Sequence, residues 1–270
     1  MPRDDVIKST GEAVEKIVEK IPAYEDAVQP LAKEVGKALG TIGGLINLAL
    51  APISVMVQGY GYIQQDITRR LEEKLKKTDP GKIVQPPLPV VGPLLERYRY
   101  VHDDHELSEM FVNLLANAMD RDQVRKAHPA FVQVISQLSS QEGKLIRAIS
   151  LANPVAKLDI SAKDPKGQGE SPILFNFTHL GKSAGIEDCG DLVFSFLENL
   201  IRLGLINTTY GILSDQFVDE SKYEPLIGDR RIAEIRDGAA KAGREIEIYK
   251  GILRVTPFGK LFMEAVLQKL

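Results

Sequence analysis

Five consecutive residues carry the densest set of potential metal ligands in the sequence, His102-Asp103-Asp104-His105-Glu106. Imidazole nitrogens and carboxylate oxygens bind divalent metals in proteins, so residues of these types could hold an ion. The two histidines, however, are close together at the expected start of a helix, and no distant third ligand accompanies them. An acidic first helical turn, which the helix dipole favours, accounts for the same residues. We therefore predict no metal at this cluster and no cofactor in the protein.

Nucleophilic chemistry has little support in the sequence. His128 is followed by Pro129 and has no serine or cysteine nucleophile beside it in the chain. The single cysteine, Cys189, lies between Asp188 and Asp191, and negative neighbours disfavour the reactive thiolate. Residues that are distant in sequence can still meet in space, so a hydrolase assembled from such residues stays open as an alternative. The sequence itself predicts a protein that is not an enzyme and has no catalytic residues.

The chain is organised around an uncharged stretch, Ala38 to Gln65, although charged residues make up 26% of the whole sequence. Its apolar centre, Thr41 to Val57, approaches the roughly 18 residues at which a membrane-spanning helix becomes a candidate. Pro52 lies near the middle and predicts two apolar helices that form a bend or hairpin. The side chains that define this candidate membrane or partner segment are Leu45, Ile46, Leu48, Leu50, Ile53, Val55, Met56 and Val57.

Three hypotheses explain this apolar hairpin. In the first, it is a helix pair buried in the core of the domain. In the second, it is a permanent membrane anchor, although Pro52, Asn47 and Gln58 weaken such a span. In the third, it is buried at rest and released into a membrane on activation. Cations just after the hairpin would suit an anionic inner leaflet, and these are Arg69, Arg70, Lys74, Lys76 and Lys77.

We predict a helical N-terminal domain over residues 1–138. Apolar residues recur every three or four positions over 4–21, 23–38 and 66–77, which is typical of amphipathic helices. A Pro-rich strap over 78–93 is expected to be extended, with four apolar side chains buried beneath it: Ile83, Leu88, Val90 and Val91. Helices are expected again over 105–120, capped by Asp103 or Asp104, and over 129–138.

A second, smaller domain of α+β type is predicted over residues 139–270. Ser139-Ser140-Gln141-Glu142 is a capping box for a helix over 141–152. Alternating apolar residues predict strands over 155–161, 173–178, 205–213 and 245–256. Helices are expected over 188–203, over 223–240 within a charged insertion at 214–244, and from Pro257 onward. The fold class is therefore mainly α with a smaller α+β part, and the second domain resembles a winged-helix module with an enlarged wing.

Nucleic-acid binding by this winged-helix-like module is not favoured by its charges. The candidate recognition helix, 188–203, carries Asp191 and Glu198 against the single Arg202. A helix that enters the major groove needs cations for phosphates and donors for base edges. We therefore predict that the module contacts a protein, and a winged-helix-type transcription regulator remains an alternative.

The composition is that of a globular cytoplasmic protein. Hydrophobic residues make up 44% of the chain and the formal net charge is −3, so the bulk basic charge of many nucleic-acid-binding proteins is missing. One cysteine excludes an intramolecular disulfide. The N-terminal run MPRDDVIKSTGEAVEKIVEK is charged throughout and is not a cleavable signal peptide. We expect a cytoplasmic protein that can be peripheral at the inner membrane.

Three runs of sequence resemble a known family. These are "LEEKLKK…QPPLPVVGPLLE", "HELSEMFVNLLANAMD" and "HPAFVQVISQLSSQEGKLI", with "GGLINLALAPI" upstream and "LIRLGLI" downstream. In this order and spacing they are similar to the abortive infection alpha (Abi-alpha) family of bacterial proteins, over most of the chain. The resemblance implies a role in phage resistance. It assigns no catalytic residues that could be transferred to this chain.

Residues and resemblance together predict a non-enzymatic protein of bacterial phage defence. Its apolar hairpin is expected to act on the inner membrane when infection is sensed. The alternative is a sensor or adaptor that binds a phage or host protein and does not touch lipid. A protein partner is expected in both cases, nucleic acid is not, and self-association into a homo-oligomer stays open.

Overall fold

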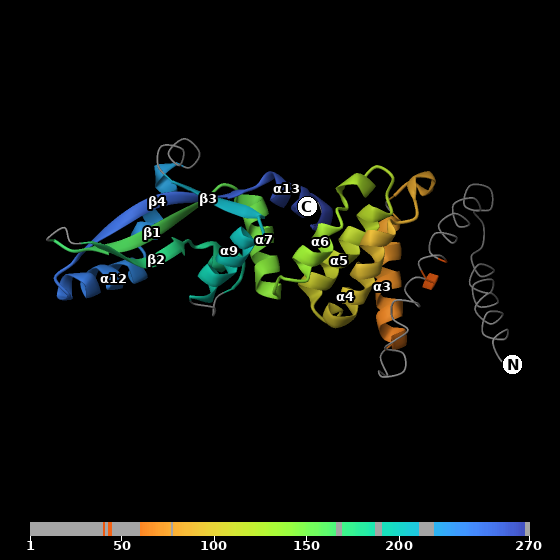
Figure 1. Ribbon diagram of the computed structural model, residues 1–270, viewed down its shortest axis with the longest axis horizontal. Coiled ribbons are helices and arrows are strands. Elements are labelled where there is room, and N and C mark those ends of the chain that lie inside the picture. The colour runs from red at the N-terminus through yellow and green to blue at the C-terminus, as the bar shows by residue number, and fades with distance from the viewer. Residues whose placement is uncertain are drawn as a thin grey trace.

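The computed structural model describes residues 40, 43–44, 60–76, 78–165, 169–186, 191–210 and 219–267 of the 270-residue chain. Within these ranges the protein is mainly helical and carries one four-stranded antiparallel sheet. Figure 1 shows that the sheet and most of the helices lie at opposite ends of an elongated molecule. The predicted fold class, mainly α with a smaller α+β part, is confirmed at this level.

Several predictions concern residues outside the described ranges. They include the helices expected over 4–21 and 23–38, Cys189, and most of the apolar hairpin. All eight of its selected side chains are in this group: Leu45, Ile46, Leu48, Leu50, Ile53, Val55, Met56 and Val57. Of the helices that the structure does describe, none combines the length and the apolar character needed to cross a membrane.

Helix α3 (Tyr60–Leu75) begins inside the uncharged stretch and continues into the charged segment after it, as predicted. Its buried side chains recur every four residues and therefore share one face of the helix. They are Ile63, Ile67, Leu71 and Leu75, each no more than 4% exposed. Acidic and basic side chains occupy the remaining faces.

The Pro-rich strap is shorter than predicted. A short 3-10 helix, η1 (Pro80–Lys82), opens the segment, and the extended part ends where helix α4 (Leu88–Val101) begins. The predicted strap was too long for a physical reason. The backbone N–H groups in the first turn of a helix have no partner within the helix, so Pro89, which lacks an N–H, fits there. Pro93 lies inside the helix.

The new helix start also changes which side chains of the strap are buried. Val90 and Val91 are buried, as predicted, and they belong to the inner face of α4. Leu88 is 63% exposed, so the prediction that it is buried is wrong. Ile83 is partly buried and packs at the edge of the core.

Helix α5 (His105–Ala118) is the centre of the helical body. Asp104 caps it, because its Oδ1 accepts a hydrogen bond from the Leu107 amide at 3.0 Å. Most of its side chains are buried, including Met110, Phe111, Leu114 and Leu115. A helix buried on most faces needs neighbours all around it, and α5 contacts α3, α4 and the later helices α6, α7 and α13.

The chain then passes through η2 (Val124–Lys126) to α6 (Ala130–Ile135) and α7 (Ser140–Ala152). The predicted capping box at the start of α7 is confirmed. The Ser139 amide donates to Glu142 Oε2 at 2.6 Å, and the Glu142 amide donates to Ser139 Oγ at 3.3 Å. Both hydrogen bonds satisfy amides that the helix itself leaves unpaired.

The sheet is built from β1 (Val155–Lys163), β2 (Glu170–Phe177), β3 (Ile206–Tyr210) and β4 (Glu245–Val255). Their spatial order is β2-β1-β4-β3, and every neighbouring pair is antiparallel. The two long strands, β1 and β4, form the centre. All four strands were predicted, with ends that differ by a few residues.

One face of the sheet is covered by the insertion between β3 and β4. Leu158, Ile160 and Ile252 of the sheet form a buried cluster with Tyr223, Leu226 and Ile232. These last three belong to the segment of η3 (Glu220–Lys222), α11 (Glu224–Ile227) and α12 (Arg230–Lys241). The single helix predicted over 223–240 is therefore two helices. The break is at Asp229, whose side chain caps α12 by accepting from the Arg231 amide at 2.9 Å.

Helices α8 (Leu180–Ser183) and α9 (Leu192–Arg202) follow β2 in the chain. The face of the sheet opposite the insertion carries a polar trio of Lys157, Asp159 and Tyr210, in which Lys157 and Asp159 are buried and Tyr210 is 48% exposed. The Lys157 ammonium, fully buried, donates to both carboxylate oxygens of Asp159 at 2.8 and 2.9 Å. It also donates to the Tyr210 hydroxyl at 2.6 Å, and that hydroxyl donates to Asp159 at 2.6 Å. Burial lowers the pKa of Lys157 and the Asp159 carboxylate opposes this effect. The trio ties β3 to β1 across β4.

Helix α13 (Pro257–Val266) leaves β4 and returns to the helical body (Figure 1). Its start lies against the turn between α9 and β3 so closely that a Cβ on Gly259 would be 1.9 Å from the Leu205 carbonyl oxygen. Its far end packs on α5. One buried cluster therefore includes side chains from α3 to α7, α9, β3, β4 and α13.

Candidate functional site

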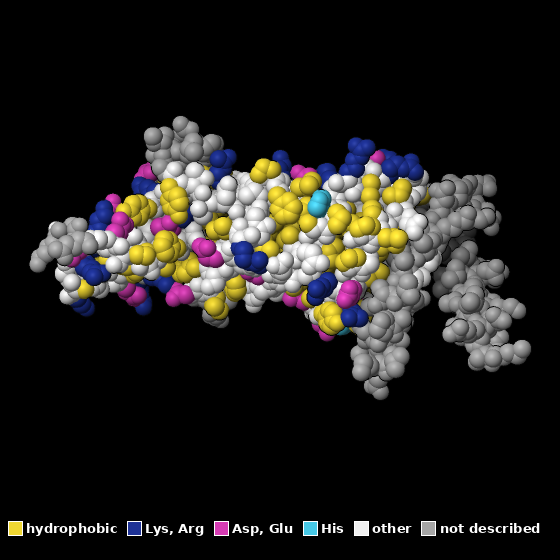
Figure 2. Space-filling view, viewed as in Figure 1, with side chains coloured by type: hydrophobic (Ala, Val, Ile, Leu, Met, Phe, Trp, Pro, Cys, Tyr) yellow, Lys and Arg dark blue, Asp and Glu magenta, His cyan; other side chains and the backbone are white. Residues whose placement is uncertain are grey.

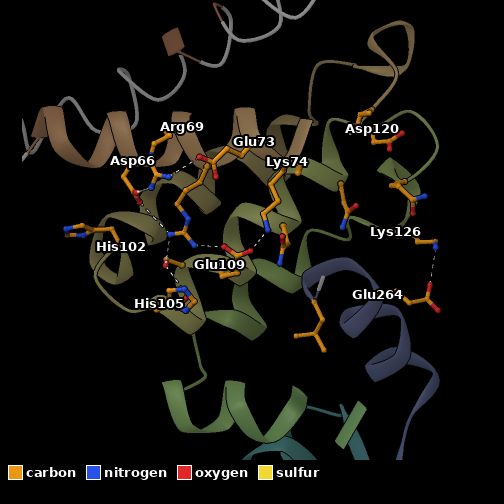
Figure 3. Close-up of a pocket in the computed structure, with 18 of the residues that line it drawn as sticks. Asp66, Arg69, Glu73, Lys74, His102, His105, Glu109, Asp120, Lys126 and Glu264 are labelled. Carbon is orange, nitrogen blue, oxygen red and sulfur yellow. Dashed lines mark hydrogen bonds and ion pairs between the residues drawn. The ribbon is translucent and has the colours of Figure 1, made fainter. Parts of the chain in front are cut away.

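A groove with a volume of about 980 Å³ runs along the helical body between α3, α5 and the end of α13. We call it the charged groove. Figure 3 shows side chains of both signs along it, contributed by α3, by the turn between α4 and α5, by α5, by the segment after α5 that includes η2, and by α13. They include Asp66, Arg69, Glu73, Lys74, His102, His105, Glu109, Asp120, Lys126 and Glu264.

Glu109 of α5 is the centre of an ion-pair network in this groove. Its Oε2 accepts from Arg70 Nη2 at 2.6 Å, and its Oε1 accepts from the Lys74 ammonium. The three side chains are only 13–20% exposed. Burial acts to raise the pKa of Glu109, but the hydrogen bonds from Lys74 and Arg70 outweigh it, so the pKa is lowered. Glu109 therefore stays charged and holds α3 to α5.

Arg70 extends this network to α4. Its Nη1 donates to Ser108 Oγ at 2.8 Å and to the Tyr98 hydroxyl at 3.3 Å. The Tyr98 hydroxyl donates in turn to Asp66 Oδ2 at 2.8 Å. Burial and the hydrogen bond to Asp66 raise the pKa of Tyr98 well above its usual range. Burial would raise the pKa of Asp66 too, but Tyr98 and the arginines lower it.

Sequence reasoning did not identify this network, although α3 carries a signal for part of it. Asp66, Arg70 and Lys74 repeat every four residues, one position before the buried residues Ile67 and Leu71. Charged residues at the edge of an apolar stripe lie where the helix meets its neighbour. Their partner on α5 is distant in sequence, so the pairing itself is visible only in the structure.

The network gives three of the cations after the uncharged stretch partners within the protein. Arg70 and Lys74 were expected to suit an anionic leaflet, but both are mostly buried and paired with Glu109. Arg69 is exposed and pairs with Asp66 and Glu73. Because these guanidinium and ammonium groups already have carboxylate partners, they are not a free basic patch next to the hairpin.

The other end of the charged groove is closed by α13. The side-chain amide of Asn113 donates to the Val266 carbonyl at 2.8 Å, and that of Asn117 donates to the Ala265 carbonyl at 2.7 Å. The last carbonyls of a helix have no partner within the helix, so these amides dock the end of α13 on α5. Lys126 and Glu264 add an ion pair at 3.1 Å.

The histidines of the predicted metal cluster lie at one end of this groove. His102 Nδ1 is 3.1 Å from the Arg99 carbonyl oxygen, and its Nε2 is 3.2 Å from Asp103 Oδ1. His105 lines the groove, while Asp104 caps α5 as described above. Across the ranges that the structure describes, no three His, Cys, Asp or Glu side chains are grouped so that they could hold a metal ion.

His128 lies at the helix entry that the sequence predicted. Its ring is 5.7 Å from that of Phe131, measured between centroids. Its Nδ1 accepts from the Ala130 amide at 3.1 Å, so this nitrogen helps to start α6. The contacts of His128 are therefore those of a residue that packs and caps.

The candidate recognition helix has its charges committed to neighbours within the protein. Asp191 pairs with Arg231 of α12, and Glu198 accepts a hydrogen bond from the Asn176 side chain. Arg202 donates to the side-chain oxygens of Asn199 at 2.6 Å and Gln137 at 3.0 Å. The single cation of this helix is thus held in place by side-chain oxygens of α9 and of the loop after α6.

Comparison with known proteins gives one family. The family model described as "Abortive infection alpha" matches residues 59–266, which include nearly all of the described helices and the whole sheet. No curated protein matches the chain. One similar solved structure is that of an uncharacterized protein from the hydrocarbon-degrading marine bacterium Alcanivorax borkumensis SK2. It is 21% identical, covers 55% of this chain and 96% of its own, and has a TM-score of 0.34, which carries no argument about fold or function.

Proposed function

Because the chain belongs to the abortive infection alpha family, we propose that it is a phage-defence protein that acts by binding and not by catalysis. Its effector is the uncharged stretch, Ala38 to Gln65, which acts on the inner membrane after infection. At rest the protein is cytoplasmic. A phage or host protein supplies the trigger.

The observation that carries this proposal is the position of α3. This helix starts at Tyr60, within the uncharged stretch, and continues to Leu75. Its charged face is fixed to α5 through Arg70, Lys74 and Glu109. The uncharged stretch is therefore joined to the protein by a helix that a mostly buried ion-pair network holds. A partner that enters the charged groove contacts this network directly.

A charge in the middle of the uncharged stretch tests the membrane step. Ala49→Asp places an unpaired carboxylate where the stretch would enter hydrocarbon, at a cost of about 2.5–3.5 kcal/mol. Ala49→Asn is similar in size and uncharged, so it controls for shape and polarity. We expect Ala49→Asp to lose both phage protection and the infection-dependent move to the membrane fraction, and Ala49→Asn to keep more of both.

The comparison requires both variants to be folded, which their thermal unfolding establishes. A folded Ala49→Asp variant that still protects cells contradicts the membrane step. Membrane fractionation of the wild-type protein before and after infection is a second, independent measurement. A wild-type protein that stays in the cytosolic fraction during a protective response contradicts it as well.

A second candidate function is that of an adaptor that never contacts lipid. It is favoured by the charged groove itself, whose walls offer exposed acidic and basic groups to a polar partner. Glu73 is 56% exposed on the α3 wall, where it pairs only with Arg69 among the described residues. A segment of a partner protein with charges of both signs would complement such walls.

Charge reversal on the groove wall separates this candidate from the first. Glu73→Lys changes the groove but breaks only a surface pair, so it should fold normally. Glu96→Lys makes the same charge change on the exposed side of α4, outside the groove. The adaptor function predicts that Glu73→Lys loses phage protection and that Glu96→Lys keeps it. Equal protection by both variants contradicts an adaptor that uses this groove.

For the sheet half of the protein, we infer a winged-helix-like module that contacts protein. The supporting order is α7, β1, β2, α8, α9, β3 and β4, with the insertion between β3 and β4 in the position of a wing. A DNA-binding use is disfavoured by the acidic residues of α9 and by the hydrogen bonds that Arg202 already makes. Arg202→Ala should therefore leave any association with duplex DNA unchanged in a salt titration.

A further inference from the structure

A second groove, with a volume of about 420 Å³, lies where β2 ends and α8, α9 and α12 begin. We call it the aromatic groove. Its apolar part contains the rings of Phe177 and Phe194, whose centroids are 6.3 Å apart, together with Ile186 and Val193. Pockets that bind small molecules combine such an apolar lining with a few converging polar groups, and this groove has the volume that they require.

His179 and Asp229 are the fixed polar groups of the aromatic groove. His179 Nε2 is 2.9 Å from Asp229 Oδ2, and Asp229 Oδ1 accepts from the Arg231 amide. Burial acts to raise the pKa of Asp229, but the hydrogen bonds from the Arg231 amide and His179 lower it. Both carboxylate oxygens thus have donors within the protein. Because His179 Nε2 donates to Asp229, Nδ1 is the acceptor nitrogen of the neutral ring.

Two cations lie at the rim of the same groove. Lys182 is exposed and forms no ion pair with any described residue. The Arg231 guanidinium lies 5.2 Å from the centroid of the Phe194 ring. Its carboxylate partner, Asp191, is 76% exposed, and an ion pair that is open to water contributes at most about 1 kcal/mol. An anionic ligand can therefore replace Asp191 at little cost.

From these contacts we propose that the aromatic groove binds a small anion that carries a planar aromatic ring. The ring lies against Phe177, Phe194 and the Arg231 guanidinium, which offer flat apolar and cationic surfaces. The anionic group lies between Lys182 and Arg231, and His179 Nδ1 accepts a hydrogen bond from an N–H or hydroxyl group of the ligand. Nucleoside monophosphates and aromatic carboxylates share this chemistry, and their phosphate or carboxylate is the group that the cations recognise.

Direct titration of the full chain distinguishes the parts of this proposal. The probes are AMP, 4-hydroxybenzoate, adenosine and inorganic phosphate, each followed by isothermal calorimetry. We expect AMP or 4-hydroxybenzoate to bind, and adenosine and phosphate to bind at least tenfold more weakly because each lacks half of the recognised chemistry. Tighter binding of AMP identifies a nucleotide site, and tighter binding of 4-hydroxybenzoate identifies a carboxylate site. The proposal is wrong if neither aromatic anion binds at millimolar concentration, or if adenosine binds as tightly as AMP.

A pair of double variants locates the binding. Lys182→Gln with Arg231→Gln removes both cations of the groove, and we expect affinity to fall roughly tenfold or more, the effect of losing a charge-assisted hydrogen bond. Lys144→Gln with Arg97→Gln removes two exposed cations of the same types from α7 and α4, outside the groove. This control should bind like wild type. Equal affinity of the two double variants places the ligand elsewhere and overturns the assignment. Because binding is measured directly, the result does not depend on the proposed effector role.

Discussion

Glu109 is a single carboxylate that holds two cations from a helix 35 and 39 residues earlier in the chain. Replacing it with glutamine keeps the shape but leaves Arg70 and Lys74 mostly buried without a counter-charge. Losing partners of this kind is costly, because the remaining charges are still desolvated. We expect Glu109→Gln to lower the free energy of unfolding by about 2 kcal/mol, measured by urea denaturation.

Glu73 provides the matched comparison at the residue scale. It also lies on the wall of the charged groove and also pairs with an arginine, but that pair is more than half exposed on both sides. Water screens such pairs, so Glu73→Gln should change the unfolding free energy by less than about 0.5 kcal/mol. Similar losses of unfolding free energy in Glu109→Gln and Glu73→Gln would mean that burial of the Glu109 network does not add to its stabilising effect.

The same network predicts a pH dependence of stability. The pKa of Glu109 is lowered from its ordinary value of 4.5, and that of Asp66 from 3.8. A carboxyl with a lowered folded pKa stabilises the protein fully above its unfolded pKa, and this contribution is lost as pH falls toward the folded value. Stability should therefore decline as pH is lowered from about 5 to 3. The decline should be shallower in Glu109→Gln, and parallel curves for the two proteins would contradict the assignment.

At the scale of single residues, the sequence predicts helix-capping residues better than it predicts ion-pair partners. Asp104, the Ser139–Glu142 box and His128 were placed correctly, because a cap and its helix are within a few residues of each other. Glu109 was not identified, since its partners on α3 are separated from it by a whole helix. The rule that pairs charges four residues apart operates only within one helix.

Helix α13 begins against the backbone of the turn after α9, and Gly259 is the residue that allows this contact. A Cβ at this position would be 1.9 Å from the Leu205 carbonyl oxygen and 2.8 Å from its carbon. Backbone atoms cannot move aside as a side chain can, so Gly259→Ala should force α13 away from β3. We expect a loss of about 3 kcal/mol or more, the upper end for overpacking, measured by thermal unfolding.

Gly238 of α12 tests whether the loss at Gly259 is due to contact or to helix propensity. It is exposed, and a Cβ there would have no atom within 4 Å. Alanine is the better helix former, so Gly238→Ala should raise stability by roughly 0.5–1 kcal/mol. Opposite signs for the two substitutions are the expected result. A stabilising Gly259→Ala would show that α13 packs less closely than described.

The elements themselves were predicted best where one periodic pattern had no proline or competing cap. Strands β1, β3 and β4 and the helix start at His105 are examples, whereas β2 contains Pro172 and begins three residues before its predicted start. The predicted length of the strap was wrong because Leu88 and Pro89 were expected to be extended, although proline is well suited to a first helical turn. The prediction of one helix over 223–240 was wrong because Asp229 was not recognised as a helix cap inside the insertion.

At the scale of the whole molecule, the helical body and the sheet are joined by α13 and by a buried cluster that both share. From the sequence we predicted two domains that meet after residue 138. The periodicity of apolar residues, however, does not indicate which distant helices pack together. On the face seen in Figure 2, charges of both signs are scattered over both halves, and hydrophobic side chains gather over the helical half. The groove that we propose for the trigger lies in the helical body, whereas the aromatic groove lies beside the sheet.

Phe262 lies at the junction of these two halves and tests how tightly they are coupled. It is fully buried in α13, and its ring packs edge-on against Phe131 of α6 at 5.3 Å between centroids. Removing a buried phenylalanine side chain costs about 3–5 kcal/mol. Because α5 and α9 contribute to the same cluster as Phe262, we expect Phe262→Ala to lower amide-exchange protection in both helices by a similar free energy.

Phe258 is the control on the same helix. Its ring also contacts Phe131, at 5.4 Å, but the residue is 36% exposed. Phe258→Ala should therefore cost distinctly less and leave protection in α9 close to wild type. If Phe262→Ala instead unfolds only α13 and leaves α5 and α9 protected, the two halves open independently. In that case a signal received beside the sheet could not reach the ion pairs of α3 through this core, and the trigger would have to bind the helical body itself.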